Sequence, residues 1–172
     1  TQVIEFAGPK LQAGFEYGPF PLLLHGAYNS AKTVTLCLKM LFIMDLFPGY
    51  TFAVGRKVWD ELRKTTMSSF FKFCPRAAWE PHGRRSDTEK ILELNNGSRV
   101  IWMHLDDPDT LTLVRGLEIN GFLLDQAEEL YEEIFTALLP RLGRWDQVVV
   151  PDAVVQGHIA KTGQPWPWVH PI

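Results

Sequence analysis

The residues with the most evident chemistry lie in one stretch, Gly26 to Thr33, which reads Gly-Ala-Tyr-Asn-Ser-Ala-Lys-Thr. A short apolar run over 22–24 precedes this stretch and a helical pattern over 34–47 follows it, so we expect strand, loop and helix. Successive backbone N–H groups at a helix N-terminus bind anions. Lys32 would reach the β- and γ-phosphates of a nucleotide, and the Thr33 hydroxyl would bind Mg²⁺. The pattern therefore predicts a phosphate-binding loop formed by Gly26, Ala27, Tyr28, Asn29, Ser30, Ala31, Lys32 and Thr33.

One residue departs from the usual G-x-x-x-x-G-K-[ST] pattern, because the second glycine is replaced by Ala31. A methyl group crowds such a loop wherever the backbone needs an unusual φ. Taken alone, the loop therefore leaves two interpretations open: a phosphate site, or an ordinary strand-to-helix turn that happens to contain a glycine and a lysine.

A second chemical feature is the acid at the end of an apolar strand over 119–124, which is Asp125. A carboxylate in this place would hold Mg²⁺ through water while Thr33 ligates the ion directly. A helical pattern follows over 129–139, with Leu130, Ile134 and Leu138 on one face. Thr33 and Asp125 are accordingly the predicted metal ligands.

The elements that must position these residues alternate between strand and helix. A buried strand is predicted over 51–54, and a helix over 58–74 has an apolar stripe that includes Thr65 and Thr66. This rhythm predicts an α/β fold with a mainly parallel central sheet, helices on both faces, and 22–24, 51–54 and 122–124 as neighbouring core strands. Arg56 follows its strand at the carboxyl end, where ligands bind in such sheets, although a surface arginine is an equally good interpretation. The turn Asn95-Asn96-Gly97 predicts a β-hairpin that pairs 91–94 with 99–105.

Length and composition limit the number of domains, the kind of partner surface, and the metal and membrane features to expect. The chain has 172 residues, enough for one domain with a core, and a formal net charge of −3, so any nucleic acid must be met through a local basic face. The two cysteines, Cys37 and Cys74, lie far apart in apolar surroundings, which favours buried free thiols over a zinc site. Lys39 and Asp45 interrupt the longest apolar stretch, so no transmembrane helix is predicted.

The order of these motifs resembles the N-terminal ATPase domain of the large subunit of tailed-phage DNA-packaging terminases. The resemblance rests on residues 9–12, 24–33, 54–57 and 94–100, on Arg115-Gly116, on the strand that ends at Asp125, and on 127–129 and 138–142. It implies a P-loop NTPase fold of the RecA-like (ASCE) type that binds ATP and Mg²⁺, with Gln12 reading the adenine edge, although Gln12 also fits a plain surface glutamine. The partners it implies are double-stranded DNA, other copies of the chain in a ring, a portal protein and a small terminase subunit, in the cytoplasm of an infected bacterium.

Two positions near the predicted metal site bear on catalysis. The family's catalytic glutamate directly follows the strand-end aspartate, where this chain has Gln126, and a glutamine can position water without acting as a useful base. Either a replacement at Gln126 traps ATP, or a natural variant uses Glu128 instead. The resemblance also implies that Arg115 is an arginine finger acting on a neighbouring subunit, with an ion pair to Glu118 or Asp106 as the alternative.

We expect residues 1–172 to be a single ATPase domain, a fragment whose RNase H-like nuclease domain lies outside this sequence, since no acidic cluster follows residue 150. Two other functions stay open. A different P-loop ATPase acting on nucleic acid, such as a helicase or recombinase, would need a second lobe that the chain is too short to contain. An inactive nucleotide-binding module is compatible with Ala31 and Gln126.

Overall fold

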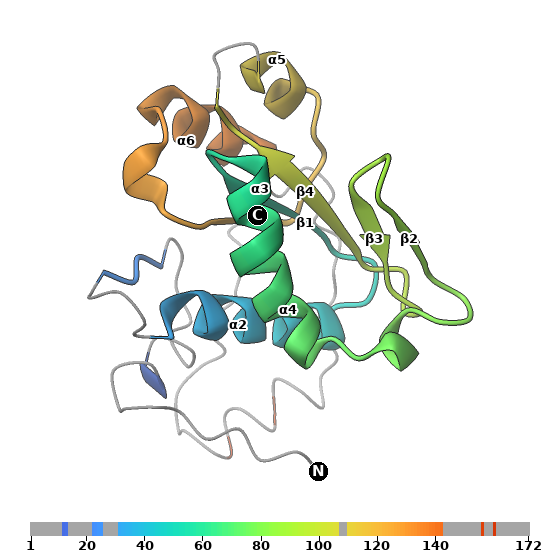
Figure 1. Cartoon of the computed structure of the whole chain (residues 1–172). Helices are drawn as coiled ribbons and strands as arrows, with labels where there is room; N and C mark the ends of the chain where they lie inside the picture. The colour runs from blue at the N-terminus through green and yellow to red at the C-terminus, as the bar shows by residue number, and fades with distance from the viewer. Residues whose placement is uncertain are drawn as a thin grey trace.

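A five-stranded sheet forms the centre of the protein (Figure 1). The structure is a computed structural model that describes residues 12–13, 22–25, 31–106, 110–142, 156 and 160. The strand order is β2-β3-β4-β1-β5. The strands are β1 (Thr51–Arg56), β2 (Arg84–Ser86), β3 (Ile91–Glu93), β4 (Arg99–His104) and β5 (Gly121–Leu124).

Helical segments connect these strands. They are α2 (Lys32–Leu46), α3 (Trp59–Glu61), the π-helical turns η1 (Leu62–Met67), α4 (Ser68–Phe73), α5 (Thr110–Arg115) and α6 (Glu132–Leu138). Three short 3₁₀ turns are η2 (Arg76–Ala78), η3 (Ala127–Glu129) and η4 (Leu139–Arg141). The helices predicted over 34–47, 58–74 and 129–139 are therefore confirmed, with shifted ends and with a π-helical stretch inside the second.

Strand β1 lies in the interior of the sheet, between β4 and β5, and is largely buried. It pairs in parallel with β4 on one side and with β5 on the other, with Val54 opposite both Trp102 and Leu123. Five of its six residues are buried, as expected for a strand that has helices on both faces. The predicted pairing of 51–54 with 122–124 is confirmed.

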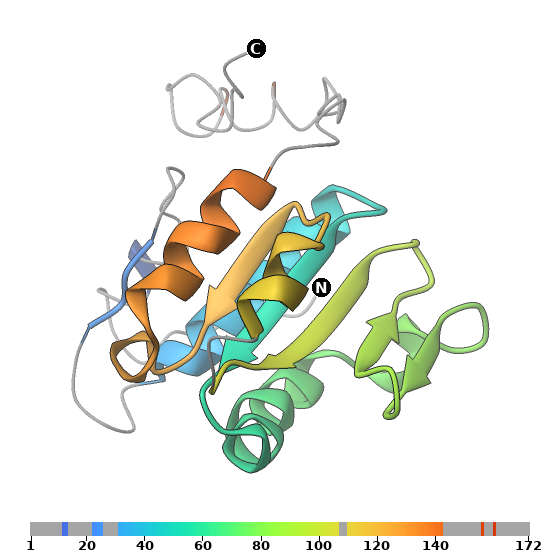
Figure 2. The same cartoon turned by 90° about the horizontal axis from the view of Figure 1, so that it is seen from above.

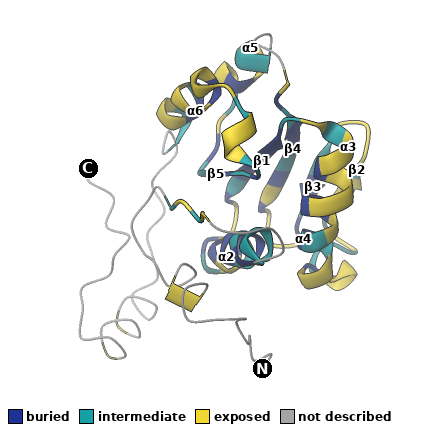
Figure 3. Ribbon diagram, turned by 60° about the vertical axis from the view of Figure 1, so that its left-hand side comes forward, coloured by how far each residue is buried: buried dark blue, intermediate teal, exposed yellow. Residues whose placement is uncertain are grey.

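Alternate residues of the strands feed two cores. Phe52, Val54 and Trp102 pack with α2, η1 and α4 in one hydrophobic cluster. Ala53 and Met103 pack with α5 and α6 in the other. Figures 2 and 3 show these two helical layers on opposite faces of the sheet, with the buried strands between them. The prediction of helices on both faces is confirmed.

Two sequence predictions are wrong in part. Residues 22–25 form no strand, and Leu23 is 80% exposed, so 22–24 is not a core strand beside β1 and β5 in the described structure. The sheet is mixed rather than mainly parallel, because β2, β3 and β4 pair antiparallel. The physical reason is the tight turn at Asn95-Asn96-Gly97, where Gly97 has φ +83°, since a short turn can join only antiparallel neighbours. The predicted hairpin itself is confirmed.

No helix within the described ranges is long and apolar enough to cross a membrane.

Candidate functional site

The carboxylate of Asp125 is the centre of the site. It follows β5 directly, is 8% exposed, and accepts a hydrogen bond of 2.9 Å from the Thr33 hydroxyl to its Oδ1. Thr33 lies in the first turn of α2, 92 residues earlier in the chain. The structure thus brings together the two residues that the sequence predicts as metal ligands, and it does so at the carboxyl edge of the parallel strands, where open α/β sheets bind ligands.

The second oxygen of Asp125 has two partners. Its Oδ2 accepts a hydrogen bond of 2.5 Å from the Thr66 hydroxyl and lies 3.4 Å from a guanidinium nitrogen of Arg56. Arg56 is the last residue of β1, and its side chain is only 9% exposed. The neighbouring strands β1 and β5 therefore end in a buried pair of opposite charges.

The Arg56 guanidinium also reaches the helical segment that follows β1. It donates to the Thr65 hydroxyl at 2.9 Å and forms an ion pair of 2.7 Å with Glu61. Its Nε is buried without a hydrogen-bond partner among the described residues. This Nε is therefore available as a hydrogen-bond donor at the edge of the site. Because an unpaired buried guanidinium N–H costs free energy, an acceptor that reaches it would be stabilised.

The segment α3–η1 supplies the remaining polar groups. Thr65 and Thr66 are consecutive residues of η1, yet one hydroxyl contacts Arg56 and the other contacts Asp125. An uninterrupted α-helix turns adjacent side chains about 100° apart. Residues 62–67 instead have π-helical hydrogen bonding, which changes the angle between adjacent side chains, and here the two threonines contact one member each of the same pair of charged residues. Such π-helical stretches are often found at functional sites.

The carboxylate of Asp125 acts electrostatically on the nearby thiol of Cys37. Cys37 lies in α2, fully buried, and its Sγ is 4.0 Å from the carbonyl oxygen of Thr66. Burial raises the pKa of the Cys37 thiol to about 12, and the nearby Asp125 carboxylate contributes to that rise. Cys37 is therefore a neutral packing residue of the site, as the sequence predicts for both cysteines.

Two residues in the left-handed backbone region flank the site. Ala31, immediately before α2, has φ 58° and ψ 18°, and Gln126, immediately after Asp125, has φ 57° and ψ 50°. Non-glycine residues seldom adopt this conformation, which costs roughly 1–2 kcal/mol and is concentrated at functional sites. The unusual φ that the sequence analysis considered at Ala31 is observed, because this residue adopts the conformation that glycine tolerates best. Crowding by its methyl group stays a prediction.

The other predicted site residues are only partly described. Lys32 is the first residue of α2 and is half-buried, whereas Gly26, Ala27, Tyr28, Asn29 and Ser30 lie outside the described residues. Gln12 is helical and exposed, so its predicted role at an adenine ring stays a prediction. Glu128 is exposed on η3, two residues after Gln126.

Arg115 ends α5 and is exposed. Within the part of the chain that the structure describes, no ion pair joins it to Glu118 or Asp106. The alternative that the sequence left open for this arginine is therefore not observed.

The donor set at Asp125 fits Mg²⁺. This ion commonly takes one or two protein oxygens and completes its octahedron with phosphate and water. Thr33 Oγ1 and Asp125 Oδ1 lie side by side and would be the protein ligands. No cluster of three or more His, Cys, Asp or Glu residues able to hold a metal occurs in the described ranges.

Thr66, Thr65 and Glu61 are the site residues that sequence reasoning missed. The available signal was the polar pair Thr65-Thr66 in the apolar stripe of a helix. A hydroxyl in a buried stripe needs a partner, and here that partner is Asp125.

The structure is similar to solved structures of a phage large terminase. Two crystal forms of the large terminase from a thermophilic bacteriophage match with TM-scores of 0.60 and 0.62, at 16% and 13% sequence identity, over 69% and 79% of this chain. The chain shares its fold with part of these phage large terminases. The match spans only 30% and 35% of the two terminase chains. The same phage terminase in complex with ADP matches similarly, with a TM-score of 0.59 at 16% identity over 69% of this chain and 29% of that chain.

The terminase fold is visible only at the level of structure. No protein-family model matches the sequence, and no curated protein matches it either. At such low identity the likeness establishes the arrangement of strands and helices, while the roles of individual side chains rest on the geometry above.

Proposed function

We propose that this chain is the nucleotide-binding motor domain of a viral DNA-packaging terminase, with a RecA-like P-loop NTPase fold that binds and hydrolyses ATP. The observation that carries the proposal is the hydrogen bond between the Thr33 hydroxyl and the Asp125 carboxylate. A hydroxyl at the start of a helix and an acid at the end of a strand are the pair that holds the Mg²⁺ of a bound nucleotide in P-loop enzymes. The large terminase of the thermophilic bacteriophage, which shares the fold, has been solved with ADP and with ATP-γ-S.

The residues divide the work according to their charge. Lys32 would place an ammonium group against the β- and γ-phosphates, and the N–H groups of the preceding loop would cradle them. Thr33 and Asp125 would hold Mg²⁺, which neutralises the charge that develops on the phosphates during transfer. Gln126, beside Asp125, can orient the attacking water through its amide but cannot take a proton from it. Glu128 is then the nearest alternative base in sequence.

Arg56 holds Asp125 in place in this proposal. Its guanidinium lies 3.4 Å from Oδ2, on the side of the carboxylate away from Thr33, so Oδ1 stays directed towards the metal position. The buried Nε is a remaining donor for a phosphate oxygen or a water molecule.

The proposed partners follow from the packaging role. They are double-stranded DNA, neighbouring copies of the chain in a ring, a portal protein and a small terminase subunit, in the cytoplasm of the infected host. Arg115, exposed at the end of α5, is proposed to reach the nucleotide site of a neighbouring copy.

Titration of a fluorescent ATP analogue in the presence of Mg²⁺ tests the nucleotide site. Lys32→Ala removes the cation of the phosphate loop, and charge-assisted contacts are worth about 1.5–3 kcal/mol, so we expect the affinity to fall roughly ten- to a hundredfold. Lys72→Ala, on the exposed face of α4, is the matched control and should leave the affinity unchanged. Equal affinities for wild type and Lys32→Ala would count against the assignment of the loop.

A further inference from the structure

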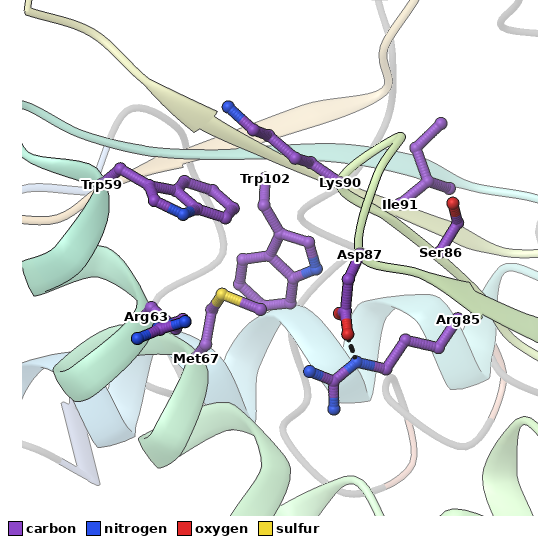
Figure 4. Close-up of a pocket in the computed structure, with 9 residues that line it drawn as sticks. All are labelled: Trp59, Arg63, Met67, Arg85, Ser86, Asp87, Lys90, Ile91 and Trp102. Carbon is purple, nitrogen blue, oxygen red and sulfur yellow. Dashed lines mark hydrogen bonds and ion pairs between the residues drawn. The ribbon is translucent and has the colours of Figure 1, made fainter.

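A pocket lies beside the segment α3–η1, which also contacts Asp125. Its volume is about 180 Å³, and it is lined by Trp59, Arg63, Met67, Arg85, Ser86, Asp87, Lys90, Ile91 and Trp102. Figure 4 shows side chains from the helical segment on one side and from the β2–β3 hairpin on the other, with Trp102 between them. Three cations and two indole rings thus converge on one cavity.

The cations in the pocket are weakly compensated. Arg85 pairs with Asp87 at 2.9 Å and its guanidinium carbon lies 4.7 Å from the Phe71 ring centroid. Arg63 and Lys90 form no ion pair with a carboxylate within the described ranges. The Lys90 ammonium instead lies 4.4 Å from the Trp59 ring centroid. The lining therefore has an excess of positive charge over an apolar floor.

The pocket lies in the most basic part of the chain. Residues 56–90 carry nine Lys and Arg against five Asp and Glu, although the whole chain has a formal net charge of −3. A local excess of this kind on an otherwise acidic protein favours a polyanion over a neutral ligand. Arginines beside aromatic rings are typical of surfaces that hold nucleic-acid strands, and here the partly exposed Trp59 lines the pocket together with Arg63 and Arg85.

We propose that this pocket holds a backbone phosphate of a nucleic acid, bound by Arg63, Arg85 and Lys90. A guanidinium fork binds two phosphate oxygens at once, and the indole walls keep water away from the contact.

The same segment joins this pocket to the proposed nucleotide site. Trp59, Arg63 and Met67 of α3–η1, spaced four residues apart, line the pocket. Glu61, Thr65 and Thr66 of the same segment contact Arg56 or Asp125. A strand bound on one face would therefore bias the position of the hydroxyls on the other, and the two ligands would change each other's affinity reciprocally. This link rests on the proposed nucleotide site, whereas strand binding does not.

Binding of a short fluorescein-labelled oligonucleotide, single-stranded and as a duplex, tests the pocket in the absence of nucleotide. For Arg63→Gln/Arg85→Gln we expect the affinity at low salt to fall about ten- to a hundredfold. Because the pocket holds one phosphate, the slope of log affinity against log salt should decrease by about 0.7 for a single strand and about 0.9 for a duplex. The matched control is Arg76→Gln/Arg99→Gln, which removes two exposed, ion-paired arginines outside the pocket, and its affinity should fall less than about threefold. Equal losses in the two double variants would overturn the proposal.

A single-cation variant and a competition experiment test the pocket independently of the double variants. Lys90→Asn removes one cation while asparagine tolerates the left-handed φ of 57° at this position, so weaker binding by this variant supports the pocket even if the double variant misfolds. ATP without Mg²⁺, or tripolyphosphate, should compete only at much higher concentration than unlabelled oligonucleotide. Competition at the same phosphate concentration would identify a site for free phosphates and overturn the nucleic-acid assignment.

The link is measured separately from binding. ATP-analogue affinity should change with saturating oligonucleotide in wild type, and Thr66→Val, which removes the hydroxyl that contacts Asp125, should reduce that change. An analogue affinity that is the same with and without bound oligonucleotide would overturn the link. A wild-type protein that binds the oligonucleotide but no analogue would instead refute the proposed function and leave the pocket assignment standing.

Discussion

The left-handed backbone at Ala31 makes a prediction about stability that is opposite in sign to the usual effect of glycine. With φ 58° and ψ 18°, Ala31 adopts a conformation that costs an L-residue roughly 1–2 kcal/mol and costs glycine almost nothing. Ala31→Gly relieves that cost but gives the unfolded chain extra freedom worth about 0.4–1 kcal/mol. Subtracting the second range from the first leaves a net gain of about 0–1.6 kcal/mol in the free energy of unfolding, with a middle value of about 0.8 kcal/mol.

The contacts of Ala31 allow a clean measurement. Its carbonyl oxygen accepts hydrogen bonds from the Thr35 N–H at 2.9 Å and the Thr35 hydroxyl at 3.0 Å, and both survive in a glycine variant because they are made to the backbone. Urea unfolding followed by circular dichroism gives the free energy for wild type and Ala31→Gly. Ala77→Gly, at an exposed residue of η2, is the matched control and should lose about 0.5–1 kcal/mol.

A further substitution tests the same reasoning in the other direction. Ala31→Val places a β-branched side chain at positive φ, where it is a conformational outlier, so we expect a loss of more than about 1 kcal/mol. If Ala31→Gly destabilises the protein as much as Ala77→Gly does, the backbone at residue 31 is right-handed and the explanation is wrong.

Four more predictions concern catalysis and titration. Gln126→Glu supplies a carboxylate beside Asp125 and should raise the rate of single-turnover ATP hydrolysis by about 10²–10⁴-fold. In that background, Arg115→Ala subunits should bind ATP normally in a titration, yet lower the hydrolysis rate of neighbouring subunits by about 10³-fold or more in mixing experiments, because a finger in trans stabilises the charge of the transition state. At pH 8, Cys37 should react with a thiol reagent about a thousandfold more slowly in the folded protein than in urea, since its pKa of about 12 leaves little thiolate. Burial lowers the pKa of Lys39 from 10.5 to about 8, so the unfolded state binds more protons above pH 8 and the free energy of unfolding should rise between pH 8 and 9, more in wild type than in Lys39→Met.

Each of these has an outcome that contradicts it. Equal hydrolysis rates for wild type and Gln126→Glu would transfer the catalytic role elsewhere, and Glu128→Gln would be the next variant. Weaker ATP binding by an isolated Arg115→Ala monomer would show that the arginine acts in its own subunit. Rapid labelling of Cys37 in the folded protein would mean that the floor of the site opens to solvent. A pH dependence that is the same in wild type and Lys39→Met would show that burial does not lower the pKa of the Lys39 ammonium group.

Much of the fold followed from local patterns. Apolar spacing predicted α2, the helical stretch over 58–74 and α6, and the turn at Asn95-Asn96-Gly97 predicted the β3–β4 hairpin, since hydrophobic period and turn chemistry are local properties. The prediction of a core strand at 22–24 was wrong, because a short run of leucines has the pattern of a buried strand whether or not a neighbouring strand pairs with it. The parallel share of the sheet was overestimated for the same reason, as strand order is set by tertiary pairing.

The sequence by itself determined which chemical groups are present and that Lys32, Thr33 and Asp125 stand at the ends of elements. It also determined that Arg56 closes a buried strand. Only the tertiary structure decided that Thr33, Arg56 and Thr66 meet at the two oxygens of one carboxylate. The physical reason is that the parallel register of β1 and β5 sets which strand ends lie together, and the π-helical turns of 62–67 set which side chains face them. Neither is encoded in a short window of sequence, because both result from long-range packing that local propensity does not contain.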